Sequence, residues 1–324
     1  MRLRSLLFVP GDRPDQMRKA LDSGADALIL DLEDSVSAGR KAQARVDVGE
    51  FLSGRRTMPL FVRINPLPSQ LADLDLDAVA DARPSGVVLP KAEGAESVTD
   101  LTRRMRARGL SAPVLPLVTE TPAALFRMGE YAQVAPSLAG VTWGAEDLSA
   151  AVGAATAREP DGAYTAPYEV ARSLTLFAAH AAQVPAIETV FPAFRDLDGL
   201  SRYAGRGARD GFTGMLAIHP AQVKIINAAF TPSAALVEHA RRIVAEFAKH
   251  PGAGVLNIDG AMVDAPHLKQ ALAVLARAEA DAVVAAAPAA GAPAPKAAPK
   301  KIHKVHHHHK KTAPAAPAAA APAK

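Results

Sequence analysis

The chain has 324 residues, of which 49% are hydrophobic and 22% charged, a composition typical of a folded protein and not of a disordered one. Its formal net charge is +4, but seven of its 37 Lys and Arg residues lie in residues 285–324, where no acidic residue occurs. The rest of the chain carries 30 basic and 33 acidic residues, so its charge does not predict a polyanionic partner. The absence of cysteine excludes disulfides, thiolate nucleophiles and zinc–sulfur sites.

The N-terminal segment does not have the pattern of a signal peptide. Its apolar run Leu6–Val9 is far shorter than the apolar region of such a peptide, and Pro10–Arg13 follow without a small-residue cleavage site. No apolar run approaches the length of a transmembrane helix. Together with the lack of cysteine, these patterns favour a soluble, cytoplasmic protein.

Short apolar segments rich in Val, Ile and Leu alternate with helix-like segments, a pattern typical of repeated βα units and a parallel sheet. The predicted strands are Ser5–Val9, Ala27–Leu32, Leu60–Ile64, Gly86–Pro90, Val114–Val118, Gly140–Trp143, Ala186–Val190 and Met215–Ile218. Amphipathic segments predict helices at Pro14–Ser23, Leu71–Ala82, Ser97–Arg108, Tyr168–Ala182 and Phe194–Gly205. Eight such units predict an α/β fold of the TIM (β/α)8 barrel type. The alternative, a Rossmann-like sheet, lacks a GxGxxG motif after the first strand.

Two further helical patterns, Ser233–His250 and Pro266–Val284, follow the eighth strand and predict an extension that packs outside the barrel or on a neighbouring subunit. Beyond it, seven prolines among Ala, Lys and His predict a disordered or extended tail. The predicted domains are therefore a catalytic barrel (1–230), a C-terminal helical extension (231–284) and an Ala/Pro/Lys/His-rich tail (285–324).

Charged residues follow most of the predicted strands, where the catalytic groups of a TIM barrel lie. They include Arg13, Glu33, Asp34, Arg63, Lys91, Glu120, Asp147 and His219. Converging carboxylates would repel one another without a cation, and Mg²⁺ prefers one or two carboxylates with waters and substrate oxygens.

Glu120 and Asp147 are the predicted metal ligands. They lie about one βα unit apart in the sequence, so that two adjacent strands can present one ligand each. We predict Mg²⁺ as the ion, with Mn²⁺ as a substitute. The alternative for any single acid after a strand is the N-cap of the next helix, and Asp147 fits that pattern too.

Arg63 is predicted to clamp a carboxylate or carbonyl of the substrate, because its planar fork matches two oxygens. Its alternative role is an ion pair with Glu33 or Asp34. Lys91 has the position of a Schiff-base lysine, but a lysine among carboxylates is held protonated, so we predict that it is the electrostatic partner of the acidic cluster.

Two aromatic side chains near the strand ends are ambiguous. His219 has the position of a general base, and equally that of a residue that begins a helix. Trp143 is predicted to be a core residue rather than a stacking surface.

Taken together, the motifs resemble the citrate lyase β-subunit-like branch of the HpcH/HpaI aldolase family. The matching runs, in chain order, are FVPGDRPDQMRKA, LILDLEDSV, VRINP, VVLPKAE, ETP, WGAEDLSAAVGA, GFTGMLAIHPAQV and DGAMVDAPHLKQA. They cover nearly all of residues 1–284. The resemblance implies a TIM barrel with a C-terminal helical extension, assembled as a trimer or hexamer, and Mg²⁺-dependent chemistry on a CoA thioester.

The resemblance also implies roles for individual residues. Glu120 of ETP and Asp147 of GAED match metal ligands, and Gly144 and Ala145 of the same run match substrate contacts. Arg63 of VRINP matches a residue that touches substrate oxygens.

Asp264 of MVDAP matches an acid–base residue that the extension of a neighbouring subunit supplies. By sequence pattern alone it would be a helix N-cap. Arg13 or Lys19 is expected to neutralise CoA phosphates.

These inferences predict a lyase that cleaves or forms a 3-hydroxyacyl-CoA such as malyl-, citramalyl- or citryl-CoA, giving acetyl-CoA or propionyl-CoA and a 2-oxo acid. One alternative is a malyl-CoA-type thioesterase with the same site. A free-acid pyruvate aldolase is disfavoured by the extension. An alternative of another class is weak binding of nucleic acid or of a granule surface by the basic tail.

Overall fold

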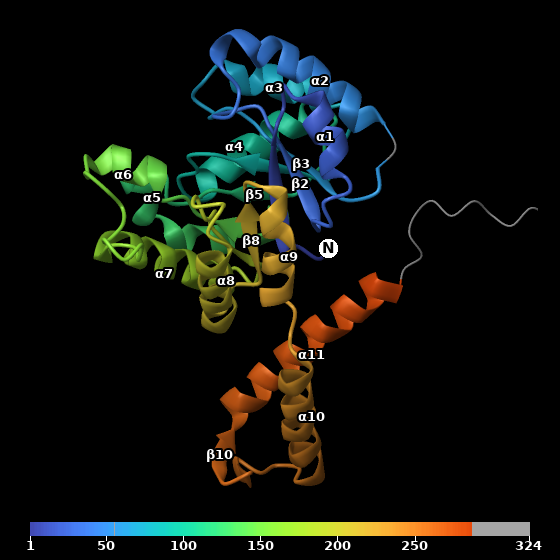
Figure 1. Ribbon diagram of the computed structural model, residues 1–324, viewed down its shortest axis with the longest axis vertical. Helices are drawn as coiled ribbons and strands as arrows, with labels where there is room; N and C mark the ends of the chain where they lie inside the picture. The colour runs from blue at the N-terminus through green and yellow to red at the C-terminus, as the bar shows by residue number, and fades with distance from the viewer. Residues whose placement is uncertain (55, 287–324) are drawn as a thin grey trace, which may run out of the picture. The chain divides into compact units, whose positions relative to one another are not determined.

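A computed structural model describes residues 1–54 and 56–286 of the chain (Figure 1). Its eight main strands are β1 (Ser5–Pro10), β2 (Ala27–Asp31), β3 (Leu60–Arg63), β4 (Gly86–Leu89), β5 (Val114–Pro116), β6 (Val141–Thr142), β7 (Ala186–Glu188) and β8 (Gly214–Ala217). Each lies where the sequence predicts a strand, and its ends differ from the predicted ends by two residues at most.

The strands form one parallel sheet that closes into a barrel. Its hydrogen-bonded order is β5-β4-β3-β2-β1-β8-β7-β6. β5 and β6 stand at the two ends of this order. Next to them, Leu117 forms a parallel bridge with Thr142, and the Val118 N–H donates to the Thr142 carbonyl over 3.0 Å. The prediction of a TIM barrel is therefore confirmed.

Helices follow the strands and surround the barrel (Figure 1). They are α1 (Pro14–Ala20), α2 (Lys41–Ser53), α3 (Leu71–Val79), α4 (Gly94–Arg106), α5 (Pro122–Leu125), α6 (Glu146–Val152), α7 (Ala166–Ala181), α8 (Leu197–Asp210) and α9 (Pro220–Ala229), with 3-10 segments at η1 (Ala38–Arg40) and η2 (Met128–Ser137). None of them is long and apolar enough to cross a membrane, and the same is true of every other described helix.

Alternation along the strands builds two apolar layers, because successive side chains point to opposite faces of a sheet. Leu6, Ile29 and Phe61 belong to the cluster inside the barrel, whereas Leu7, Leu28 and Val62 pack against the helices. Gly86 is required beside the inner layer, since a Cβ there would lie 2.1 Å from a ring carbon of Phe61.

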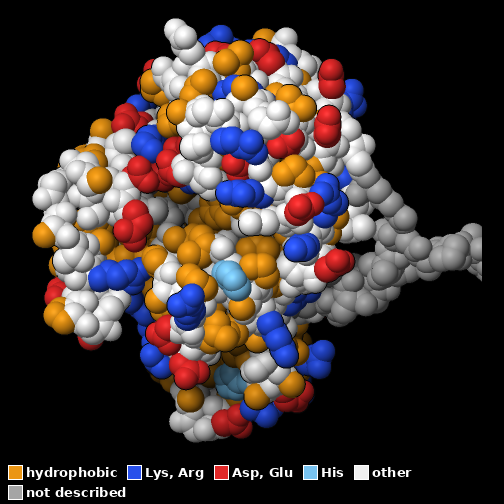
Figure 2. All heavy atoms as spheres, turned by 45° about the horizontal axis from the view of Figure 1, so that its top comes forward, with side chains coloured by type: hydrophobic (Ala, Val, Ile, Leu, Met, Phe, Trp, Pro, Cys, Tyr) orange, Lys and Arg blue, Asp and Glu red, His pale blue; other side chains and the backbone are white. Residues whose placement is uncertain are grey.

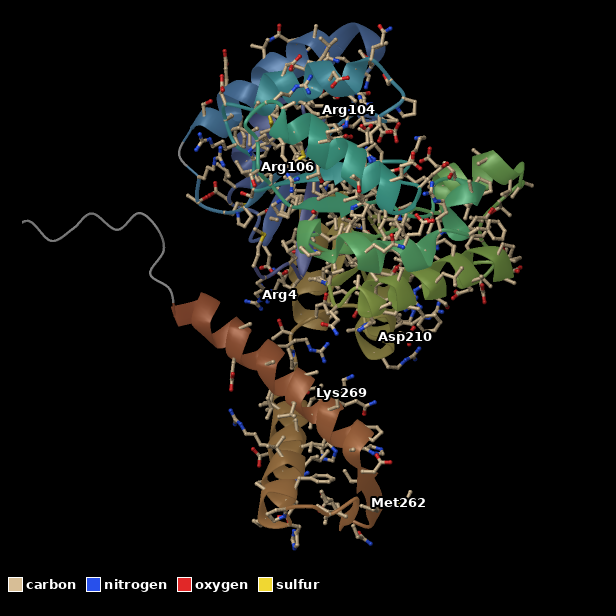
Figure 3. All side chains as sticks on the ribbon, turned by 180° about the vertical axis from the view of Figure 1, so that it is seen from behind. Arg4, Arg104, Arg106, Asp210, Met262 and Lys269 are labelled. Carbon is tan, nitrogen blue, oxygen red and sulfur yellow. The ribbon has the colours of Figure 1, made fainter. Side chains whose placement is uncertain are left out.

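After the eighth strand and α9 come α10 (Ala234–Lys249), the antiparallel strands β9 (Val255–Ile258) and β10 (Ala261–Asp264), and α11 (Ala265–Ala286). These elements share a small apolar cluster of their own. We call them the extension. Figure 3 marks two of its residues, Met262 on the hairpin and Lys269 on α11.

The helices of the extension lie where the sequence predicts them, and α11 continues two residues past the predicted end. The domain boundary at residue 230 stays a prediction. From residue 287 onward, the predicted tail lies outside the described residues.

Candidate active site

The strand register brings charged residues together at the carboxyl ends of the strands. Pro10 of β1 is paired with Asp31 of β2, and Asp31 is paired in turn with Arg63 of β3. Because parallel strands end at the same edge, the residues after β4, β5 and β6 reach the same volume.

A cavity of about 390 Å³ lies there, lined by Phe8, Asp31, Asp34, Ser35, Arg63, Leu117, Glu120, Trp143, Gly144, Ala145, Glu146, Asp147, Tyr164, Thr189, Val190, Leu216 and Ile218. Its lining thus combines acidic side chains with apolar ones. The face of the molecule in Figure 2 likewise carries a hollow where hydrophobic side chains gather, with acidic and basic side chains around it.

Arg63 is held in one orientation by acidic neighbours. Its Nε and one terminal nitrogen each donate to an oxygen of Asp31 over 2.7 Å, and its other terminal nitrogen lies 3.0 Å from Glu33. Its guanidinium also lies over the Phe8 ring, 4.8 Å from the centroid. Such a paired, stacked guanidinium is fixed in place while it still lines the cavity.

The ion pair with Asp31 dominates the protonation of both groups. Burial acts to raise the pKa of Asp31, but the hydrogen bonds and charge of Arg63 outweigh it and hold that pKa below its usual value. Burial acts to lower the pKa of Arg63, and its bonds to Asp31 raise it instead. Both groups are therefore charged at neutral pH.

Lys91 connects three carboxylates. Its Nζ lies 3.3 Å from Glu33 and 3.0 Å from Asp147, and its backbone N–H donates to Glu120 over 2.6 Å. The backbone of Lys91 is left-handed (φ 50°), a conformation that costs free energy in a residue other than glycine and is often found at functional sites. Burial acts to lower its pKa, but the bond to Asp147 and the surrounding carboxylates raise it. Lys91 is therefore a cation here and not the free amine that a Schiff base needs.

Glu120 is buried, with 4% of its surface exposed, and its carboxyl carries the largest upward pKa shift of the acidic cluster. Burial raises its pKa to about 8, and the charges of Asp147 and Glu33 add to this, against the hydrogen bond from Lys91. Burial also raises the pKa of Glu33 to about 7, with Arg63 opposing. A cation bound at this place would remove the cost of ionising both groups.

A hydrogen-bonded link between two loops brings Glu120 and Asp147 together. The Thr119 hydroxyl donates to the Gly144 carbonyl over 2.6 Å and accepts the Gly144 N–H over 3.0 Å. A Cβ on Gly144 would lie 3.4 Å from a Glu120 oxygen, so a larger residue would crowd the carboxylate. Asp147 lies in the first turn of α6, whose N-cap is Ala145, so the N-cap alternative for Asp147 is wrong.

Most of the predicted site residues lie in this cluster. Arg63, Glu120, Gly144, Ala145, Asp147 and Asp34 line the cavity, and Glu33 and Lys91 join them through ion pairs. The alternative for Arg63, an ion pair, is also present, although its main partner is Asp31 and not Glu33 or Asp34.

Asp264 is not among the residues that line the cavity. It ends β10 and directly precedes α11, and its carboxylate lies 2.5 Å from His267 Nδ1. The extension instead borders a crevice of about 850 Å³ that is also lined by Met1–Arg4, at the amino end of the barrel. Asp264 therefore takes no part in the cavity of its own chain.

His219 is the N-cap of α9, in agreement with the prediction that it begins a helix. Its Nδ1 accepts the Ala221 N–H over 3.2 Å, and its ring stacks on Phe194. Arg13 pairs with Asp12 over 3.6 Å and is mostly exposed, which leaves its expected role towards CoA phosphates as a prediction.

Trp143 is fully buried, and its indole N–H donates to Glu188 over 2.6 Å. Although part of the core, it also borders the cavity.

Asp31, Thr119 and Phe8 are residues of the site that the sequence reasoning did not select. Asp31 is the next-to-last residue of the predicted strand Ala27–Leu32, so its position at the barrel mouth could have been found. The roles of Thr119 and Phe8 depend on contacts across strands, for which a single sequence has no signal.

The comparisons with known proteins agree with this geometry. Residues 4–220 match the family model HpcH/HpaI aldolase/citrate lyase. Mouse mitochondrial citramalyl-CoA lyase is 33% identical over 288 residues, which cover 83% of each chain. The (3S)-malyl-CoA thioesterase of Cereibacter sphaeroides is 34% identical, over 86% of this chain and 95% of the relative.

Among solved structures, protein CitE of Mycobacterium tuberculosis in complex with magnesium, acetoacetate and coenzyme A superimposes with a TM-score of 0.75 at 34% identity, over 86% of this chain and 98% of that one. These relatives indicate an enzyme of the CoA-ester lyase class. The chain belongs to the HpcH/HpaI aldolase/citrate lyase family, as its motifs predict.

Proposed function

We propose that this protein is a magnesium-dependent lyase that cleaves, or in reverse forms, a 3-hydroxyacyl-CoA to give acetyl-CoA or propionyl-CoA and a 2-oxo acid. The observation that carries the proposal is the pair Glu120 and Asp147, which follow neighbouring strands and both contact Lys91 at the wall of an apolar cavity. The magnesium and coenzyme A in the CitE complex support it.

The donor set fits magnesium. Two carboxylates leave room for the waters and substrate oxygens that complete its octahedron. No group of three or more His, Asp or Glu side chains that could hold a metal occurs among the described residues, so waters and substrate oxygens would supply the other ligands. When bound, Mg²⁺ supplies positive charge beside the oxygens of the acid fragment.

The chain's own residues then share the remaining tasks. Arg63, fixed by Asp31, donates to substrate oxygens and stabilises the negative charge that develops as the carbon–carbon bond breaks. The apolar part of the cavity excludes water from the enolate. Asp264 of a second copy of the chain gives a proton to the enolate carbon of the acyl-CoA fragment.

The charges of the cavity favour malyl- or citramalyl-CoA over citryl-CoA. Arg63 is the only cation among the described residues that line the cavity, and carboxylates already surround it. The acid fragment released from citryl-CoA would place one more carboxylate in the cavity than glyoxylate or pyruvate, the fragments of malyl- and citramalyl-CoA. Leu117, Val190 and Leu216 instead offer apolar surface to a methyl branch.

We expect the affinity for Mg²⁺ to rise with pH up to about pH 8. With the pKa of Glu120 raised to about 8, its carboxyl holds a proton at lower pH, and the cation must displace that proton to bind. One displaced proton makes the affinity change at most about tenfold per pH unit. The chain's one tryptophan, Trp143, borders the cavity, so a Mg²⁺ titration followed by its fluorescence between pH 6 and 9 measures this. An affinity that is constant over this range would contradict it.

The proposed reaction is tested with malyl-, citramalyl- and citryl-CoA, assayed with Mg²⁺ and again after EDTA. We expect cleavage of the first or second, loss of activity with EDTA and recovery when Mg²⁺ is restored. Unchanged activity in EDTA would refute the metal site. Citryl-CoA as the best substrate would refute the assignment of the acid fragment.

Hydrolysis of the thioester is the second candidate, because the (3S)-malyl-CoA thioesterase is as similar to this chain as the lyase is. The products of malyl-CoA distinguish the two. Glyoxylate and acetyl-CoA indicate cleavage of the carbon–carbon bond, whereas malate and free CoA indicate hydrolysis.

Three further sequence predictions stand as proposals. They are the assembly as a trimer or hexamer, the cytoplasmic location, and weak polyanion binding by the tail. Deleting residues 285–324 and comparing both activity and retention on DNA tests the last one.

A further inference from the structure

We propose that His267 is the positioning residue and proton source of Asp264. The inference rests on the proposed function, in which Asp264 acts on a substrate in the cavity of a second copy. It concerns a side chain that the sequence reasoning did not select. His267 is the third residue of α11, and Asp264 directly precedes that helix.

One atom of His267 makes two contacts with Asp264. His267 Nδ1 lies 2.5 Å from Asp264 Oδ1 and 3.2 Å from the backbone nitrogen of Asp264. The residue before a helix and the third residue of the helix are three positions apart and lie on the same side of its first turn, so the helix itself brings the two side chains together. Pro266, at the start of α11, favours the backbone angles of that turn.

The two contacts require Nδ1 to carry a hydrogen in one case and a lone pair in the other. At 2.5 Å, the Oδ1 and Nδ1 atoms share a proton, because two lone pairs at that distance would repel. The contact with the backbone N–H needs the opposite arrangement, with a lone pair on Nδ1. His267 with a hydrogen on Nδ1, as in the imidazolium, therefore donates to the carboxylate of Asp264, and His267 with a lone pair on Nδ1 accepts from the backbone of the same residue.

This pairing meets a need that an aspartate alone does not meet. With an ordinary pKa near 3.9, only roughly one aspartate in a thousand carries a proton at pH 7. An imidazole side chain exchanges its proton much closer to neutral pH than a carboxyl does and so can resupply the carboxyl within each turnover.

The proton balance is complete in the cleavage direction. The Asp264 carboxyl gives its proton to the enolate carbon, which forms the new carbon–hydrogen bond of the acyl-CoA. The Nδ1 proton of the imidazolium passes to Asp264, and His267 stays neutral with its proton on Nε2. A proton from solvent then restores the imidazolium, and the proton of the substrate hydroxyl leaves through solvent.

Charged and titratable groups also lie on the elements that pack together with the pair. On α10, which packs against α11, and on the segment between α10 and β10, they are Glu238, His239, Arg241, Arg242, Glu246, Lys249, His250 and Asp259, and α11 adds Lys269, Arg277 and Glu279 up to residue 280. Glu246 is paired with Lys249, and Arg242 with Asp259. Within the described part of the chain, none of them forms an ion pair with Asp264 or His267.

The test is the variant His267→Gln in the full-length protein. Glutamine keeps a polar side chain at the helix start but carries no proton that titrates near neutral pH. We expect kcat for cleavage to fall about 10- to 100-fold with KM unchanged. The pH profile of kcat should differ from that of the wild type. Mg²⁺ affinity, read from Trp143 fluorescence, should stay the same.

His250→Gln is the matched control. His250 is an exposed histidine of the same extension, and its Nδ1 forms a hydrogen bond with the Glu246 backbone carbonyl over 3.0 Å. We expect wild-type kcat and an unchanged pH profile from it.

Two outcomes separate this inference from the proposed function. If Asp264→Asn keeps wild-type turnover, Asp264 has no catalytic role and the proposed function is wrong at that point. If Asp264→Asn is inactive but His267→Gln keeps the wild-type pH profile, whatever its kcat, only the proposed role of His267 is refuted.

Discussion

Replacing Glu120 by glutamine should lower kcat at least about 100-fold and remove the Mg²⁺-dependent change in Trp143 fluorescence. The amide has nearly the same shape and can still accept the Lys91 N–H, which now lies 2.6 Å from the carboxylate. The fold should therefore persist while the charge that binds the cation is lost. Isothermal calorimetry with Mg²⁺ and a steady-state assay measure the two effects.

Glu238→Gln provides the control, because Glu238 is exposed on α10, outside the residues that line the cavity. It should bind Mg²⁺ and turn over substrate like the wild type. Wild-type Mg²⁺ affinity in Glu120→Gln would show that the ion, if it is used, binds elsewhere.

The variant Asp264→Asn should lower kcat at least about 100-fold and leave Mg²⁺ affinity unchanged. Asp264 does not line the cavity of its own chain, so its loss should not disturb the metal site. The same calorimetric and kinetic measurements separate the two variants. Glu120→Gln should lose both Mg²⁺ binding and turnover, whereas Asp264→Asn should lose only turnover.

Mixing the two inactive variants tests whether Asp264 acts on a second copy. Co-expressed Glu120→Gln and Asp264→Asn chains should recover activity, because some cavities then combine an intact Glu120 with an intact Asp264 of a neighbour. Random mixing should restore about a quarter of the wild-type activity. If the mixture stays as inactive as its components, Asp264 does not act between copies.

The barrel could be predicted from sequence because each strand is a short, nearly continuous apolar run with polar residues after it. Parallel strands buried on both faces have this pattern. Helix α2 is not among the predicted helices, although Ala44, Val48 and Leu52 are buried at a spacing of four, because the apolar Val46 lies on its exposed face and Gly49 interrupts it.

The hairpin of the extension carried a recognisable signal that the sequence reasoning did not use. Asp259-Gly260 separates two short apolar segments, and both residues have positive φ angles in the structure, as a two-residue hairpin turn requires. The surrounding segment was read only as a connection between two helices. Recognising the turn would have placed Asp264 at the end of a strand.

The positions of the candidate site residues followed from the rule that charged residues after barrel strands converge. Their partners did not follow, because the choice of Asp31 over Glu33 as main partner of Arg63 depends on strand register. The contact of His267 with Asp264 was likewise hidden, although a spacing of three at a helix start permits it.

The balance of charge at the barrel mouth has a consequence for the order of events. Five carboxylates, from Asp31, Glu33, Asp34, Glu120 and Asp147, face the two cations Arg63 and Lys91. When ionised they repel an acyl-CoA, which is itself an anion. A divalent cation has to lower this barrier first. We therefore expect a compulsory sequence in which the metal enters before the thioester, so that raising the substrate concentration cannot compensate for missing magnesium.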